Sequence, residues 1–163
     1  MSPNKELPHV LVLPEDDANR QLAKGFHLQI DSTRQRQMQI LQPANGWSNV
    51  MEVFLSDHVP EMDRYPTRAM VLVIDYDEDE KRLDRCRDRV PNHLAERVFI
   101  LGSFDEPEKL TNELGAYEII GAGMAKDCRE GTDTTWGHNH LRHNAGELER
   151  LRAHLYAILF ASQ

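Results

Sequence analysis

Short apolar runs and amphipathic stretches alternate along this chain. Each of four strand-like runs is followed by a stretch whose apolar residues recur every three or four positions, as in a helix. The predicted strands are residues 9–13, 36–41, 69–74 and 97–102, and the predicted helices are residues 15–28, 48–59, 78–90 and 108–115. The run 69–74 is apolar throughout, as in strands buried on both faces of a parallel sheet. The alternation predicts a three-layer α/β fold with a mostly parallel sheet.

The periodicity weakens after Gly115. The segment YEIIGAG, residues 117–123, is a possible fifth strand, which gives a sheet of about four to five strands. We expect residues 116–143 to be irregular and residues 144–163 to form a helix, because Asn144 and Glu147 have the spacing of an N-cap residue and its N3 partner. The prediction is a single domain over residues 1–163, with its α/β core at residues 8–115.

The charge of the chain limits its function. Its 163 residues include 19 basic and 27 acidic side chains, which gives a net charge of −8. This excess of acid argues against a protein that coats nucleic acid, because phosphate binding is largely electrostatic. It is compatible with an enzyme that reaches nucleic acid through bound cations, since metal ions reverse the local sign of charge.

Several features favour a cytoplasmic protein without a membrane partner. No apolar run approaches the roughly 18 residues of a membrane span, and the N-terminal residues lack the apolar core of a signal peptide. The two cysteines, Cys86 and Cys128, are too few for a disulfide framework.

Acidic residues stand at the ends of two predicted strands. Glu15 follows the first strand, and Asp75 and Asp77 follow the third. In an extended chain Asp75 and Asp77 point the same way, roughly 6–7 Å apart, and all three carboxylates meet at one edge of the sheet if the two strands are neighbours. Such a set suits a hard cation, Mg²⁺ or Mn²⁺. Glu78 and Asp79 instead suit the positive start of the helix 78–90.

This pattern resembles the TOPRIM fold of topoisomerases, primases, ribosomal RNA maturases and nucleases of the overcoming-lysogenization-defect class. In that family a Glu ends the first strand and an Asp-x-Asp pair ends a later apolar strand. The resemblance covers roughly residues 8–115 and implies that Asp75 and Asp77 bind Mg²⁺, with Glu15 in acid–base chemistry or as a further ligand. The Glu of the family is usually followed by a glycine, whereas this chain has Asp16.

The opening VLVLPEDDANRQLAKGF also resembles a response-regulator receiver domain, in which an acidic pair follows the first strand. That resemblance makes Asp75 the phospho-accepting residue, Ser103 the hydroxyl residue after the fourth strand, and Lys126 an approximate match for the lysine after the fifth. The chain departs from receivers in three respects. It lacks both the proline that follows the acceptor and the Lys-Pro pair, and it has a second aspartate, Asp77.

Residues 126–143 contain a cysteine and three histidines, namely Cys128, His138, His140 and His143. Zinc binds such side chains, although their spacing matches no standard finger. A second interpretation is a loop over the acidic edge, where one of the histidines is a proton donor or a phosphate contact, because histidine titrates near neutral pH. The third is a loop that packs against the last helix.

Together with the acidic set, the TOPRIM resemblance implies metal-dependent phosphodiester hydrolysis or transfer on DNA or RNA. The expected cofactor is Mg²⁺ or Mn²⁺, held by Glu15, Asp75 and Asp77, and the expected catalytic residues are Glu15, His138 and His140. The alternative is a receiver-like or catalytically silent binding or signalling module that acts through a protein partner. A domain of this size has little surface for nucleic acid, so we expect a homodimer or a subunit of a larger assembly.

Overall fold

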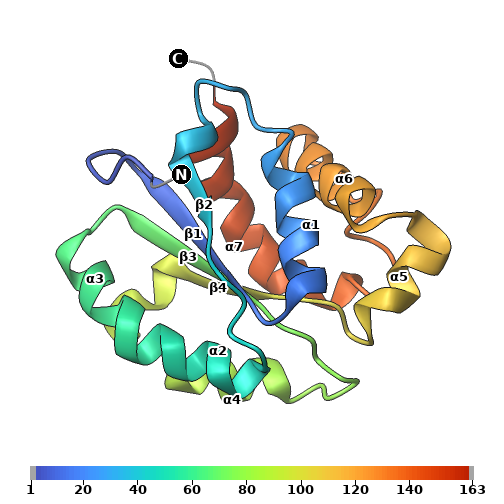
Figure 1. Ribbon diagram of the computed structural model, residues 1–163, viewed down its shortest axis with the longest axis horizontal. Helices are drawn as coiled ribbons and strands as arrows, with labels where there is room; N and C mark the ends of the chain where they lie inside the picture. Colours follow the sequence, from blue (N-terminus) through green and yellow to red (C-terminus); the bar gives the residue numbers. More distant parts are fainter. Residues whose placement is uncertain (1–2, 162–163) are drawn as a thin grey trace.

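The computed structural model describes residues 3–161 and contains a four-stranded parallel sheet (Figure 1). Strands β1 (His9–Pro14), β2 (Met38–Ile40), β3 (Arg68–Val73) and β4 (Val98–Leu101) lie in the order β2-β1-β3-β4. Val12 of β1 pairs with Ile40 of β2 and with Val71 of β3. All the strands run the same way, so their carboxyl ends meet at one edge of the sheet, and the predicted α/β fold is confirmed.

The helices follow the strands in the predicted alternation. After β1 comes α1 (Asp17–His27), and after β2 come α2 (Trp47–Val53) and α3 (Val59–Arg64), joined by the π-helical turn Phe54–His58. After β3 comes α4 (Arg82–Arg89), and after β4 come α5 (Pro107–Leu114), α6 (Tyr117–Glu130) and α7 (Ala145–Leu155), which the π-helical turn Tyr156–Phe160 extends. Short 3₁₀ helices lie at Gln35–Gln37, Asn92–Arg97 and Arg142–Asn144. Within residues 3–161, no helix has both the length and the apolar character needed to span a membrane.

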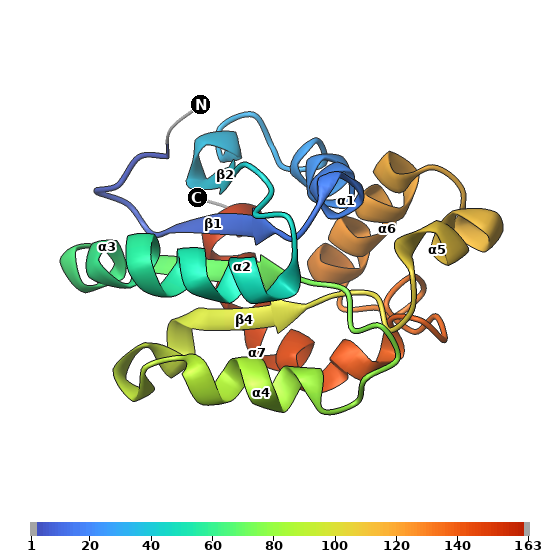
Figure 2. The ribbon, with the colours of Figure 1, turned by 60° about the horizontal axis from the view of Figure 1, so that its bottom comes forward.

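Two hydrophobic cores lie on opposite faces of the sheet, because successive strand residues point in opposite directions. Val12 and Val71 face the core formed with α1, α6 and α7, whereas Leu13 and Leu72 face the core formed with α2, α3 and α4. Figures 1 and 2 show these two helical layers on either side of the sheet, with α5 beyond its carboxyl end.

The prediction of a fifth strand at residues 117–123 is wrong, because α6 occupies this stretch. The prediction of an irregular segment at 116–143 is wrong over the 14 residues of α6, whereas residues 131–141 form no helix or strand, as expected. Its buried Ile120, Met124 and Cys128 recur every four residues, which is a helical period. Gly121 permits a close crossing of α6 over α1, since a Cβ there would lie 2.1 Å from the carbonyl oxygen of Leu22. Gly121 therefore serves the packing of α6 on α1.

The helix after β3 begins at Arg82, four positions later than predicted. Asp77 and Glu78 have φ angles of 47° and 60°, in the left-handed region, and so lie in a turn. The prediction that Glu78 and Asp79 start this helix is therefore wrong. Asp79 instead accepts a hydrogen bond from the backbone N–H of Lys81, at 3.0 Å.

The last described helix, α7, begins at Ala145, but the predicted capping pair does not form. The side chain of Asn144 instead bonds both the N–H and the carbonyl of Gly102, at 3.0 and 2.9 Å. Glu147 accepts a hydrogen bond from the N–H of Ile100, at 3.1 Å. Residues 162 and 163 of the predicted helix lie outside the described residues.

Side chains thus satisfy the outer edge of β4, where a further strand would otherwise pair. Arg87 and Arg150 donate to the carbonyl of Val98, at 2.9 and 3.3 Å. Both arginines also form ion pairs with Glu147, at 2.9 and 3.0 Å. This arrangement, together with Asn144, closes the sheet at four strands.

Candidate acidic site at the carboxyl end of the sheet

The strand order brings Glu15 and Asp75 together. β1 and β3 are neighbours, and the N–H of Glu15 donates to the carbonyl of Val73, at 2.8 Å. The carboxylate of Glu15 in turn accepts a hydrogen bond from the N–H of Asp75, at 2.6 Å. The Glu15 side chain therefore crosses from the end of β1 to the end of β3.

Asp75 is a buried carboxyl group with mostly acidic surroundings. It is 9% exposed, and its Oδ1 accepts a hydrogen bond from the amide of Asn19, at 3.1 Å. Among the described residues, no basic side chain pairs with its carboxylate. Burial raises the pKa of Asp75 to about 7, and the negative charges of Asp16, Glu15 and Asp77 add to this effect.

Burial also raises the pKa of Glu15 above its usual value. The N–H of Asp75 and the positive charge of Arg82 act in the opposite direction, while the charges of Asp16 and Asp77 raise the pKa further. Two neighbouring carboxyl groups in this site therefore both bind protons more readily than usual.

Asp77 is turned toward Arg82 rather than held in an extended chain. β3 ends at Val73, and Asp77 has a positive φ angle. The chain is therefore not extended at Asp77, and its side chains do not alternate between the two faces as they do in a strand. The expectation that Asp75 and Asp77 point the same way along an extended strand is therefore wrong. The carboxylate of Asp77 is 3.0 Å from the guanidinium of Arg82, which also donates to the carbonyl of Asp75 at 2.6 Å and stacks over Trp47.

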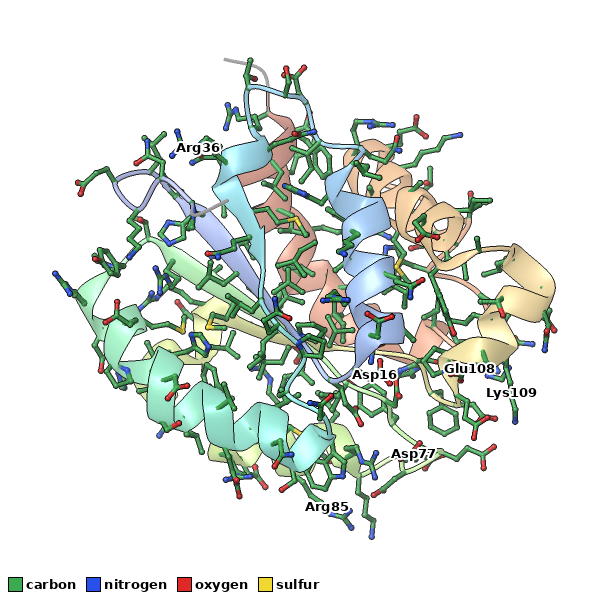
Figure 3. The ribbon with its side chains drawn as sticks, in the orientation of Figure 1. Asp16, Arg36, Asp77, Arg85, Glu108 and Lys109 are labelled. Atoms are coloured by element: carbon green, nitrogen blue, oxygen red, sulfur yellow. The ribbon has the colours of Figure 1, made fainter. Side chains whose placement is uncertain are left out.

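The site includes residues that the sequence analysis did not assign to it. Asp16 caps α1 by accepting a hydrogen bond from the N–H of Asn19, at 3.0 Å, and Asn19 itself is fully buried. Tyr117, the first residue of α6, has its pKa raised by burial and by the charges of Glu108, Asp16 and Asp75. Figure 3 shows Asp16, Asp77 and Glu108 at the same end of the molecule, with Arg36 at the other. The sequence contains one indication that Asn19 is buried in the site: it is a polar residue on the apolar face of α1.

Ser103 follows β4, as the receiver resemblance requires. Its side chain is buried, and its Oγ has no hydrogen-bond partner in the part of the chain that the structure describes. The carbonyl of Ser103 accepts from the N–H of Tyr76, at 2.9 Å, so the segments after β3 and β4 are joined. Lys126 lies exposed on α6 rather than at the end of a strand.

The histidine segment folds against the loop after β4. The N–H of Phe104 donates to the carbonyl of His140, at 2.9 Å, and His138 pairs with Glu113 of α5. The ring of His138 also accepts from the N–H of His140, at 3.1 Å. Within residues 3–161, no hydrogen bond or ion pair joins His138 or His140 to the three predicted carboxylates, and their catalytic role stays a prediction.

The donor atoms fit Mg²⁺ better than zinc. Cys128 is buried in the core of α6, where burial raises its pKa to about 11 and so favours the thiol over the zinc-binding thiolate. Within residues 3–161, no three or more Cys, His, Asp or Glu side chains are grouped as a metal site. Mg²⁺ needs no such group, because it is commonly held by one or two carboxylates, several waters and substrate phosphate. Glu15 and Asp75 offer two such carboxylates.

Comparison of the chain with protein-family models, with curated proteins and with solved structures finds no match.

Proposed function

We propose that the protein catalyses Mg²⁺- or Mn²⁺-dependent phosphodiester hydrolysis or transfer on DNA or RNA. The observation that supports this proposal most directly is Asp75, a buried carboxyl group beside Glu15 and without a basic partner among the described residues. Clustered carboxylates repel one another, and a divalent cation relieves this repulsion while keeping each group ionised.

In this proposal Glu15 and Asp75 hold the cation, and each has a structural element that orients it. The N–H of Asp75 fixes the Glu15 carboxylate, and the amide of Asn19 fixes the Asp75 carboxylate. When bound, the cation stabilises negative charge on the phosphate and the leaving oxygen. Asp77 becomes a third ligand if it leaves Arg82, and Arg82 is then available to a phosphate.

Glu15 is also the proposed acid–base residue. When Glu15 is not bound to the cation, its raised pKa brings proton binding closer to neutral pH, where a general base is most effective. A bound cation would instead keep this carboxylate ionised. The remaining oxygen of Glu15, Oε1, makes no hydrogen bond to the described part of the chain.

Metal binding is the first test of the proposal. We expect Mn²⁺ titrated into the protein at pH 7.5 to bind, as measured by calorimetry and by electron paramagnetic resonance. Asp75→Asn should weaken binding at least tenfold, because it removes one ligand charge. Asp57→Asn is the matched control, since it removes the same charge from an exposed residue of the turn between α2 and α3.

Cleavage is the second test. Incubation with Mn²⁺ and with mixed single- and double-stranded DNA and RNA should give products that are absent with EDTA and with Asp75→Asn. Cleavage that persists in Asp75→Asn, or Mn²⁺ binding that is equal in Asp75→Asn and the wild type, contradicts the proposed mechanism.

A receiver-like module is the second candidate, and two observations favour it. The order β2-β1-β3-β4 is that of the first four strands of flavodoxin-like sheets, and Ser103 follows β4. The position of Lys126 on α6 counts against it, because no lysine then follows a fifth strand. Incubation with acetyl phosphate and Mg²⁺, followed by mass spectrometry, tests this candidate: a phosphoryl group on Asp75 supports it, and an unmodified Asp75 rejects it.

A further inference from the structure

A pocket of about 450 Å³ lies at the carboxyl end of the sheet, where Tyr76 follows β3 and Phe104 follows β4. Three chain segments form it: the loop after β3 together with the first turn of α4, Phe104 after β4, and the residues that precede α7. Its lining consists of Tyr76, Asp79, Glu80, Leu83, Phe104, Asn139, Arg142 and His143. Tyr76 lies between Asp75 and Asp77 in the chain, so the backbone after β3 links the pocket to the proposed metal site. Its volume is in the range of small-molecule sites.

Aromatic rings form the inner wall of the pocket. The ring of His143 meets that of Tyr76 edge-on, with 4.7 Å between centroids, and lies 5.5 Å from that of Phe104. Neither ring nitrogen of His143 has a hydrogen-bond partner within residues 3–161. Burial lowers the pKa of His143 to about 4, so the ring is neutral at physiological pH. The wall is therefore aromatic and uncharged.

The rim of the pocket has polar side chains that include both hydrogen-bond donors and hydrogen-bond acceptors. Glu80, Asn139 and Arg142 are exposed, and their side chains make no hydrogen bond to other described residues. Asp79 is already engaged, since it accepts from the guanidinium of Arg85 at 2.6 Å and from the N–H of Lys81 at 3.0 Å. The rim thus offers one free carboxylate, one amide and one guanidinium.

The lining has no excess of positive charge that would attract phosphate. The ion pair with Arg85 neutralises Asp79, so the charges left on the rim are those of Glu80 and Arg142, which balance, with His143 neutral. A neutral planar group that has N–H donors as well as acceptors fits this lining better than an anion does. Nucleobases have these properties, and proteins bind them by aromatic stacking and by hydrogen bonds to their edges.

We propose that this pocket binds an unpaired nucleobase, and that the substrate is consequently single-stranded nucleic acid. The inference rests on the proposed function, since the adjacent carboxylates supply the reason to expect a nucleic acid. A base in the pocket stacks on the wall of Phe104 and His143, while Glu80 and Asn139 bond its edge. A base in a duplex is stacked and paired, and cannot enter.

Binding without metal tests the pocket separately from the metal site. We expect a fluorescein-labelled single-stranded 12-mer, in EDTA, to bind the 163-residue chain at least tenfold more tightly than the matching duplex, by fluorescence anisotropy. Asn139→Ala should weaken this binding about threefold to tenfold, the usual effect of losing one hydrogen bond. Asn112→Ala, which truncates an exposed asparagine of α5, is the matched control.

Glu80→Gln distinguishes a base contact from general electrostatics. Removing a negative charge tightens non-specific binding of a polyanion, whereas losing a carboxylate that accepts from a base weakens binding. We expect weaker binding. Irradiation of a bound 12-mer carrying 5-iodouracil, followed by mass spectrometry, should then place the cross-link on Tyr76, Phe104 or His143.

The proposal is overturned by equal affinity for single strand and duplex, by no binding of either, or by cross-links outside the pocket. It is also overturned if Asn139→Ala and Asn112→Ala behave alike. Mn²⁺ binding that depends on Asp75 together with any of these results rejects the pocket alone. Single-strand binding at the pocket without Mn²⁺ binding rejects the metal mechanism alone.

Discussion

Asp75 links the stability of the protein to pH. Its pKa rises from 3.8 to about 7 on folding, so the folded protein binds this proton more tightly than the unfolded chain does. Stability therefore falls as the pH rises from about 4 to about 7 and changes little above that range. The destabilising contribution of the ionised carboxylate is complete only above the folded pKa.

Asp75→Asn should remove this contribution while keeping the acceptor for Asn19. We expect the variant to melt about 2–8 °C above the wild type at pH 8 without metal, or roughly 1–2 kcal/mol for a chain of this size, because solvent screening at the sheet edge reduces the full effect of the shift. The difference should shrink toward pH 4. Melting curves followed by circular dichroism from pH 4 to pH 8 provide the measurement, and an equal difference at every pH would show that Asp75 is not the titrating group.

At the residue scale the sequence identified Glu15 and Asp75 but not their environment. Both stand where an apolar run ends, and this pattern is visible in the sequence alone. The left-handed backbone of Asp77 was not readable, because it depends on the turn that joins β3 to α4 and on the Arg82 contact. The role of Asn19 was not predicted, because a single polar residue on an apolar helix face does not reveal its hydrogen-bond partner. That partner, Asp75, lies 56 residues further along the chain.

The crossing of α1 and α6 determines how the first layer of helices packs. Gly121 lies against the backbone of α1, and Gly25 lies against the backbone of α6, where a Cβ would be 2.3 Å from the carbonyl oxygen of Glu118. Backbone atoms cannot move aside as a flexible side chain can, so both glycines allow a contact that alanine does not.

Gly121→Ala should destabilise the protein by about 1–3 kcal/mol, the usual cost of overpacking a tight contact. Gly146→Ala is the control within another helix, because a Cβ there meets nothing within 4 Å, and it should be neutral or stabilise by up to about 1 kcal/mol. Urea unfolding measures both free energies. A Gly121→Ala variant as stable as Gly146→Ala would mean that the two helices separate at little cost.

The outer edge of β4 supports a second prediction about an element. Asn144→Ala should leave the N–H and the carbonyl of Gly102 without partners, and each unsatisfied buried group costs about 1–3 kcal/mol. We expect a loss of at least about 2 kcal/mol in urea unfolding. Glu149→Ala, at an exposed position of α7, should change stability by less than about 0.5 kcal/mol. Equal losses in the two variants would refute the role of Asn144.

The four strands and most helices were predictable because each has its own hydrophobic period. The identity of α6 was not, since Gly121 and Gly123 interrupt that period for reasons of packing against other segments. The number of strands was likewise open. Asn144 and Glu147 have a capping spacing in the sequence, and only the fold shows that their side chains bond β4.

For the molecule as a whole, the proposed cation should act as a folding ligand. If Mg²⁺ binds only the folded protein, a concentration about 100 times its Kd stabilises by about 2.7 kcal/mol, or about 5–11 °C in melting temperature. The gain should decrease below pH 7, where protons compete for Asp75. Calorimetric scans with 10 mM MgCl₂ and with EDTA give this difference. An increase that is the same in Asp75→Asn as in the wild type would assign the effect to ionic strength.

The closure of β4 by side chains has a consequence for synthesis on the ribosome. Apart from Arg87, the groups that cover the strand edge come later in the chain, with Glu147 lying 47 residues after Ile100. At roughly 5–20 residues per second, a growing chain takes about 2–9 s to cover this interval. During that time a nascent sheet exposes bare amides and carbonyls that a neighbouring polypeptide can pair with. Nascent chains stalled before Asn144 should therefore recruit chaperones that release once α7 has emerged.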